Sequence, residues 1–289
     1  MDAALNGLKI LDFSTLLPGP FATLYFADLG ADVIHVESPL RPDLIRLFPP
    51  YANGQATSHS YLNRNKQSIA LDLKDAENIE LIKSKISEFD IVVEQFRPGV
   101  MKRLGLDYQT LVEINPRLIY CSITGYGQTG VYKNKAGHDI NYLALSGVAG
   151  QSGRKQSGPP PMGIQIADVA GGSLHAIIAI LTAVIERQHS GKGQYIDISM
   201  TDCSAVLNSM AAAATLAGKK PQYREEGLLN GGAFYDYYQT QDARYLSIGS
   251  LEPQFMSGLA SILDLPLLLQ LGNSFNQADQ HLLKQAIQE

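Results

Sequence analysis

The sequence predicts an α/β fold, in which a doubly wound domain with a parallel sheet precedes a smaller region of strands and helices. Strand-like and helical patterns alternate over about the first 190 residues, as they do in doubly wound domains. Beyond residue 226 the order changes to two strands followed by helices. A chain of 289 residues is long enough for about two such domains, each with a buried core.

The chain opens with a β-α-β unit. Residues 8–13 form a β-rich run, a helical pattern over 20–29 ends at Gly30, and residues 32–37 form the next strand. Two strands joined by a helix in this way lie parallel, with a right-handed crossover. The alternation continues with predicted strands at 68–73, 90–96, 118–126 and 194–200 and a predicted helix at 75–88.

A long helix is predicted to start at Asp168, because apolar residues recur there at helical spacing. It ends between Arg187 and Gly191, where basic residues and a glycine are typical stop signals. An Ala-rich helix then follows the strand at 194–200.

The second region begins after a segment that carries Pro221 and several charged side chains, which is typical of a linker. Residues 230–250 predict two antiparallel strands around a turn at 241–243, and the pattern is helical from Glu252 onward. We therefore predict a large domain over 1–200, a helical linker over 201–226 and a small domain over 227–289.

Composition excludes several classes of protein. Two cysteines, Cys121 and Cys203, cannot form a disulfide framework or a zinc site of four thiolates. The net charge of -5 argues against a nucleic-acid-binding protein. The start of the sequence lacks a basic segment before an apolar run, and the longest low-charge stretch, around residues 203–218, is too short to span a bilayer. We expect a cytoplasmic enzyme that does not bind membranes.

The opening β-α-β unit does not contain a dinucleotide fingerprint, because its first turn, STLLPGP, has one glycine where three are needed. Basic side chains instead stand beside predicted strands: Arg64 and Lys66 precede one strand, and Arg97 follows another. Ligands of α/β proteins bind at strand ends, and Arg and Lys suit phosphate groups. Each cluster could also be an ordinary charged surface.

Three separate segments offer acid and base groups. The segment 137–142, GHDINY, holds His138 before an apolar helix, and Asp168 stands at a helix start beside two glycines that would let a ligand approach. Glu252 precedes a proline that opens another helix. Together these residues suggest an acid/base site. The alternatives are a structural histidine and ordinary helix-capping carboxylates.

A series of motifs then stands in order along nearly the whole chain: LKILDFSTLLPGPFATLYFADLGADVIHVE, NRNKQSIALDL, FRPGVMKRLGLDY, NPRLIYCSITGYGQTG, GHDINYLALSG, IADVAGG, GKGQYIDISM, GGAFYDYY and LEPQF. In these motifs the sequence resembles the family III CoA-transferases, and within them the α-methylacyl-CoA racemases. The resemblance implies an enzyme of CoA thioesters in lipid metabolism. It implies an intertwined homodimer whose protomers have a large Rossmann-like domain and a small α+β domain.

The resemblance also implies roles for individual residues. In the transferases, an Asp matching Asp168 attacks the thioester and carries the acyl group as an anhydride. In the racemases, the matching Asp and a His matching His138 flank the α-carbon, and a Glu matching Glu252 assists the His. The transferases generally lack this His. Residues matched to CoA or substrate binding are Arg64, Lys66, Arg97, Gly137, Asp139 and Tyr142.

The implied reaction is the interconversion of 2-methylacyl-CoA epimers. One of His138 and Asp168 removes the proton α to the thioester, and the other returns a proton on the opposite face. Backbone amides at the helix start of Asp168 are expected to stabilise the enolate. No metal or redox cofactor is required.

Family members normally continue for several dozen residues beyond the point that corresponds to Glu289, so the small domain is expected to be incomplete. Two alternatives therefore stand beside the racemase. One is a CoA-transferase that moves CoA between carboxylic acids, and the other is an inactive racemase-like fragment.

Overall fold

A computed structural model describes residues 3–218 and 221–289, so residues 219–220 of the predicted linker lie outside the described residues. The chain divides into two compact units. The first holds the residues up to 146 together with 163–207, and the second holds 147–162 together with 208–289. The division differs from the predicted boundaries, because residues 147–162 leave the first unit and join the second.

The first unit contains a six-stranded sheet in the order β5-β2-β1-β6-β7-β8, and every pair of neighbours is parallel. This confirms the predicted α/β fold with a doubly wound sheet. The chain moves outward from β1 through β2 to β5, then crosses back to β6 on the other side of β1. The switch point between β1 and β6 is where such sheets bind ligands. The strands are β1 (Lys9–Asp12), β2 (Asp32–Glu37), β5 (Gln67–Ala70), β6 (Ile91–Glu94), β7 (Ile119–Thr124) and β8 (Tyr195–Ser199).

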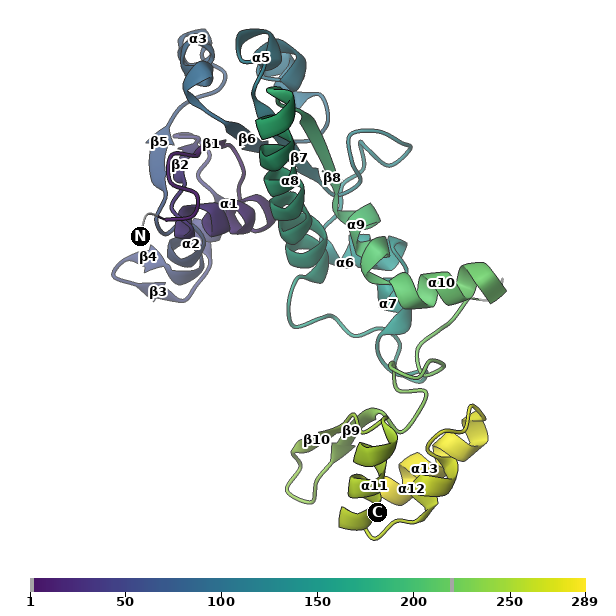
Figure 1. Ribbon diagram of the computed structural model, residues 1–289. Helices are drawn as coiled ribbons and strands as arrows, with labels where there is room; N and C mark the ends of the chain where they lie inside the picture. Colours follow the sequence, from purple (N-terminus) through teal and green to yellow (C-terminus); the bar gives the residue numbers. More distant parts are fainter. Residues whose placement is uncertain (1–2, 219–220) are drawn as a thin grey trace. The chain divides into compact units, whose positions relative to one another are not determined.

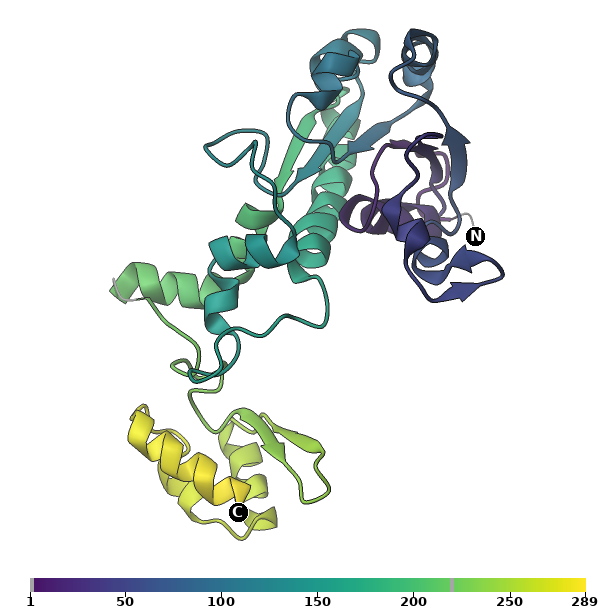
Figure 2. The same ribbon diagram turned by 180° about the vertical axis from the view of Figure 1, so that it is seen from behind.

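Helices cover both faces of this sheet, which explains why β6 and β7 are buried along their whole length. Helices α1 (Pro18–Asp28) and α8 (His175–Ser190) pack against strands on one face. On the other face, Ile82 of α3 (Ala76–Lys85) and Leu111 of α5 (Tyr108–Ile114) share a core with Val92 and Tyr120 (Figures 1 and 2). The remaining elements of this unit are short: η1 (Leu44–Leu47), β3 (Tyr51–Ala52), β4 (Gln55–Ala56), α2 (Thr57–Leu62), η2 (Ile86–Glu88), α4 (Val100–Leu104), α6 (Asp139–Leu145) and α9 (Met200–Leu207).

The long helix predicted from Asp168 begins differently from the prediction. Residues Ala167–Leu174 (η3) form a π-helix, and only from His175 does the chain continue as α8. The two glycines here serve packing, since a Cβ on Gly171 would lie 2.6 Å from the Ser204 hydroxyl oxygen of α9. The expectation that they admit a ligand was therefore wrong.

Within the described residues, the stretch Ala167–Ser190 is the one helix long and apolar enough, by length and composition, to cross a membrane. Its α8 portion packs against β7 and β8 of the sheet. Ala176, Ile180 and Ala183 of α8 are buried, whereas Ile178 and Ile185 are exposed, so this packing accounts for part of the apolar composition of the helix.

The second unit has an antiparallel hairpin of β9 (Asp236–Gln239) and β10 (Tyr245–Ile248), followed by helices, as the sequence predicted. Its core is built from Phe234, Met256, Ala260, Leu268 and Leu283. The Gln280 amide, which is buried, accepts from the Phe234 N–H at 3.0 Å and so ties the start of the hairpin segment to α13. The helices are α7 (Val148–Gln151), α10 (Ser209–Gly218), α11 (Pro253–Ile262), α12 (Leu267–Leu271) and α13 (Gln277–Gln288).

Candidate active site

A cavity of about 390 Å³ lies at the switch point of the sheet. Its walls come from the segments that follow three strands: Thr15, Leu16 and Pro18 after β1, Gln95 to Pro98 after β6, and Gly125 and Tyr126 after β7. The carboxyl ends of parallel strands meet at one edge, so these segments converge although they are far apart in sequence. The loop before α6, the α6 residue Tyr142, Asp168 and Met200 also contribute to the lining, and all of these residues belong to the first unit.

His138 lines this cavity as the residue that precedes α6. Its side chain is exposed, and its backbone N–H donates to the Asn141 side-chain oxygen at 3.0 Å. Beside it, the Tyr142 hydroxyl donates to the Gly137 carbonyl at 2.5 Å. A Cβ on Gly137 would lie 2.7 Å from the Tyr142 ring, so only glycine allows this contact. Gly137 and Tyr142 therefore shape the wall that carries His138.

Asp168 lies in the first turn of η3 and is half-buried. Its backbone N–H donates to the Asp139 carboxylate at 3.0 Å, which places two carboxyl groups close together. Burial and, as the smaller cause, the charge of Asp139 together raise the pKa of Asp168 to about 6. A carboxyl group with this pKa can both take and give a proton near neutral pH.

The capping explanation for Asp168 does not fit, because the residue at the cap position of this helix is Ile166. The expected oxyanion site at the same place does not fit either. The Asp168 N–H is bonded to Asp139, and the Val169 N–H donates to the Gln165 carbonyl at 2.9 Å. Both amides are already used within the protein.

Of the three predicted CoA-binding cations, the structure brings only Arg97 to the cavity, where it is exposed. Arg64 pairs with Asp28 on the surface and stacks on the Tyr61 ring at 4.4 Å. Neither Arg64 nor Lys66 is among the residues that line the cavity.

Lys66 has a buried ammonium group. It donates to the Pro20 carbonyl at 2.9 Å and to the Asn63 side chain at 3.0 Å, and it lies 3.5 Å from the Asp12 carboxylate. An ammonium group has three N–H donors, so none is left for a phosphate. Burial acts to raise the pKa of Asp12, but Lys66 and His35 outweigh it and hold that pKa well below its usual range. We correct the prediction for Lys66, which stabilises the fold beneath α1.

Two cations that the sequence reasoning missed, Lys133 and Lys135, line the cavity beside Arg97. The sequence does give a signal for them, because both stand in the few residues before His138.

Glu252 belongs to the second unit, where it is exposed at the cap position of α11. Its pairing with His138 stays a prediction.

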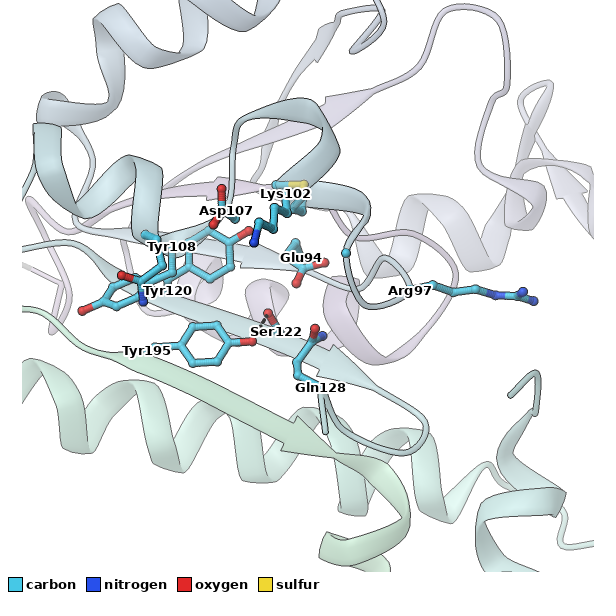
Figure 3. A pocket seen from close by; sticks show the side chains of 12 residues that line it. Glu94, Arg97, Lys102, Asp107, Tyr108, Tyr120, Ser122, Gln128 and Tyr195 are labelled. Carbon is cyan, nitrogen blue, oxygen red and sulfur yellow. Dashed lines mark hydrogen bonds between the residues drawn. The ribbon is translucent and has the colours of Figure 1, made fainter. Parts of the chain in front are cut away.

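A second cavity, of about 270 Å³, lies between the sheet and the α4–α5 segment (Figure 3). The Glu94 side chain points into it, beside Ser122 and near the rings of Tyr120 and Tyr195, while Arg97 extends away from this group. Burial raises the pKa of Glu94 to about 7, although the Phe96 N–H donates to its carboxylate at 2.7 Å. Sequence reasoning missed Glu94, whose one signal is an acid inside the apolar run DIVVEQF.

Residues 3–218 and 221–289 contain no group of three or more His, Cys, Asp or Glu side chains that could hold a metal ion.

Comparison with known proteins shows similarity along nearly the whole chain. The chain is 40% identical over 253 residues to alpha-methylacyl-CoA racemase of Mus musculus, which covers 87% of this chain and 62% of that protein. It is 38% identical over 267 residues to succinyl-CoA:glutarate CoA-transferase of Homo sapiens, covering 92% of this chain and 60% of that protein. The chain thus spans about three fifths of the length of these curated relatives.

Among solved structures, the chain is similar to a CAIB/BAIF family protein from Brucella suis. The TM-score is 0.81 at 32% sequence identity, and the match covers 100% of this chain and 79% of that chain. The sequence also matches CoA-transferase family III over residues 5–289. The resemblance noted from the motifs is confirmed, and this chain belongs to CoA-transferase family III.

Proposed function

We propose that the protein interconverts the two epimers of a 2-methylacyl-CoA by proton transfer at the α-carbon. The observation that carries the proposal is that His138 and Asp168 line one cavity at the switch point of the sheet. A reaction that removes a proton from one face and returns one to the other needs two acid/base groups. A half-buried carboxyl with a pKa of about 6 is suited to one of these roles, and an imidazole is suited to the other.

In the proposed reaction, the base form of one group takes the α-proton, and the electron pair of the C–H bond moves to the thioester oxygen as an enolate. The acid form of the other group then protonates the α-carbon on the opposite face, and the thioester carbonyl is restored. No metal or redox cofactor is needed, because both transfers are made by side chains and CoA is part of the substrate.

Arg97, Lys133 and Lys135 support an anionic substrate, since three cations line the same cavity. We propose that they hold phosphate groups of CoA, which replaces the earlier assignment of Lys66. The same proposal includes the pairing of Glu252 with His138 and the formation of a homodimer. Light scattering measures the oligomeric state directly. A cytoplasmic location stays a prediction.

A CoA-transferase is the second candidate, and the identities favour it almost equally: 38% to a transferase against 40% to a racemase. In that reaction the Asp168 carboxylate would attack the thioester carbonyl, release CoA as the thiolate and hold the acyl group as an anhydride. The acyl group would then pass to a second carboxylic acid. This chemistry uses Asp168 but has no evident use for His138.

The deciding experiment incubates the protein with one epimer of a 2-methylacyl-CoA in deuterated water. We expect the second epimer to appear with deuterium at the α-carbon. The His138→Ala variant should lose interconversion by a factor of about 10²–10⁴, which is the usual contribution of a positioned base. The matched control is His189→Ala, because His189 is exposed in the last turn of α8.

The opposite pattern would support the transferase. In that case CoA moves from an acyl-CoA to an added carboxylic acid, a covalent adduct accumulates on Asp168, and His138→Ala leaves the rate unchanged. A chain that does neither reaction contradicts both candidates.

A further inference from the structure

The loop that follows β1 holds one residue in an unusual backbone conformation. Leu16 has a φ of +60°, in the left-handed region that side chains with a Cβ rarely adopt. Leu16 is among the residues that line the candidate cavity. A conformation of this kind persists only where the surroundings enforce it, and such residues concentrate at functional sites.

Two side chains from other elements enforce the conformation. The buried Asp43 carboxylate accepts from the Leu16 N–H at 2.9 Å. The Gln95 amide donates to the Thr15 carbonyl at 2.6 Å and accepts from the Gly19 N–H at 3.1 Å. These bonds fix the backbone at Leu16 and on both sides of it.

The first turn of α1, which follows the loop directly, is tied in the same way. The Ser173 hydroxyl, from η3, donates to the Pro18 carbonyl at 2.7 Å, and Lys66 donates to the Pro20 carbonyl at 2.9 Å. The loop therefore has its shape before any ligand binds, which is the condition for a preorganised wall.

The chemistry of this wall differs from that of the cations. Leu16, Pro18, Phe96, Ile123 and Met200 supply apolar groups to the same cavity as His138 and Asp168. An apolar wall suits the hydrocarbon part of a thioester, whereas Arg97 and the two lysines suit its phosphates.

We propose that Leu16 is a specificity-determining residue whose side chain contacts the acyl group of the bound thioester, and that Asp43 and Gln95 are positioning residues that hold it there. This inference rests on the proposed function, because it assumes an acyl-CoA in the cavity. Because these hydrogen bonds fix the backbone of the loop, Leu16 selects among acyl groups by the length of the chain that fits against it.

The test compares Leu16→Ala and Leu16→Gly, which both remove the contact with the acyl group. We expect both variants to lower kcat/KM for the preferred 2-methylacyl-CoA by about tenfold or more, and to discriminate less between short and long acyl chains. Affinity for free CoA, measured by calorimetry, should not change. The matched control is Leu17→Ala, because Leu17 is the neighbouring residue and is not among those that line the cavity.

The two variants should differ in stability. Glycine adopts a positive φ without the steric conflict that alanine keeps, so Leu16→Gly should unfold at a higher temperature than Leu16→Ala. At an ordinary loop position the more flexible glycine would be the less stable of the two. The thermal comparison thus tests the left-handed conformation itself.

Unchanged chain-length discrimination in both variants would overturn the proposal, as would an equal loss of affinity for free CoA and acyl-CoA. If the wild-type protein shows no exchange at the α-carbon, the proposed function fails separately. The ratio of acyl-CoA to CoA affinity still decides the role of Leu16: a smaller ratio in the two variants supports it, and an unchanged ratio refutes it.

Discussion

Replacing Asp139 by asparagine tests how the pKa of Asp168 is set. The Asp139 carboxylate accepts from the Asp168 N–H at 3.0 Å, and its charge adds to burial in raising that pKa to about 6. Asparagine keeps an oxygen that can accept the same hydrogen bond, but it carries no charge. The variant therefore removes the repulsion between the two carboxylates and leaves the contact in place.

The effect follows from the fraction of Asp168 that holds a proton. With a pKa of about 6, roughly one tenth of Asp168 is protonated at pH 7, whereas the ordinary value of 3.8 would leave less than about one part in a thousand. In Asp139→Asn we expect a pKa between these values, because burial, the larger cause, remains. Proton return by Asp168 at pH 7 should slow by at most about a hundredfold.

The assay is the initial rate of epimer interconversion, in both directions, between pH 4 and pH 8. The acidic limb of the kcat/KM profile should move to lower pH in Asp139→Asn, because Asp168 then loses its proton at lower pH. The control is Asp32→Asn, an exposed carboxylate at the start of β2. An acidic limb that stays in place, or that moves to higher pH, would refute this account of Asp168.

The interaction of Asp139 with Asp168 should also affect how the stability of the protein depends on pH. The folded pKa of Asp168 lies above its ordinary value, so the native state holds this proton more tightly than the unfolded chain does. The wild-type protein therefore loses part of its stability as the pH rises from about 4 to about 6. In Asp139→Asn that loss should be smaller, and thermal unfolding at the two pH values measures it.

Three further changes test individual side chains. Lys66→Met leaves the Asp12 carboxylate buried without its cation, so the free energy of unfolding in urea should fall by about 3–5 kcal/mol. The folded variant should keep its CoA affinity. Unchanged stability with a loss of CoA affinity would instead support Lys66 as a CoA ligand. Because burial raises the pKa of Glu94, the wild type should lose stability between about pH 4.5 and about pH 7, and Glu94→Gln should remove that loss. Melting curves with the same pH dependence in both proteins would contradict this. Arg97→Glu should weaken CoA binding in calorimetry and reduce its dependence on salt, whereas Lys192→Glu, an exposed control, should not.

Much of the fold could be predicted from the sequence, because each element is encoded locally. The apolar runs of β6 and β7 and the stop signals at Gly30 and Gly191 depend on neighbouring residues alone. The π-helical start of η3 could not be predicted, because it accompanies the close contact of Gly171 with Ser204 of α9.

The candidate site was predictable in its position. His138, Asp168 and Arg97 stand beside predicted elements of a doubly wound sheet, and such a sheet gathers the segments that follow its strands at one edge. Motifs that resemble a known family then associated these residues with a reaction. Sequence order and the topology rule were sufficient for the first step, and the second step needed the resemblance.

The surroundings of each side chain depended on the tertiary structure. The sequence predicts that Lys66 is a phosphate ligand. In the structure, the packing of α1 places its ammonium group beside Asp12. The contact between Asp139 and Asp168 adds to the rise of a pKa, and Asp43 and Gln95 hold the left-handed backbone of Leu16. Both sets of contacts join segments that are distant in sequence. Burial and charge act over a few ångströms in space, so they were decided only when the chain folded.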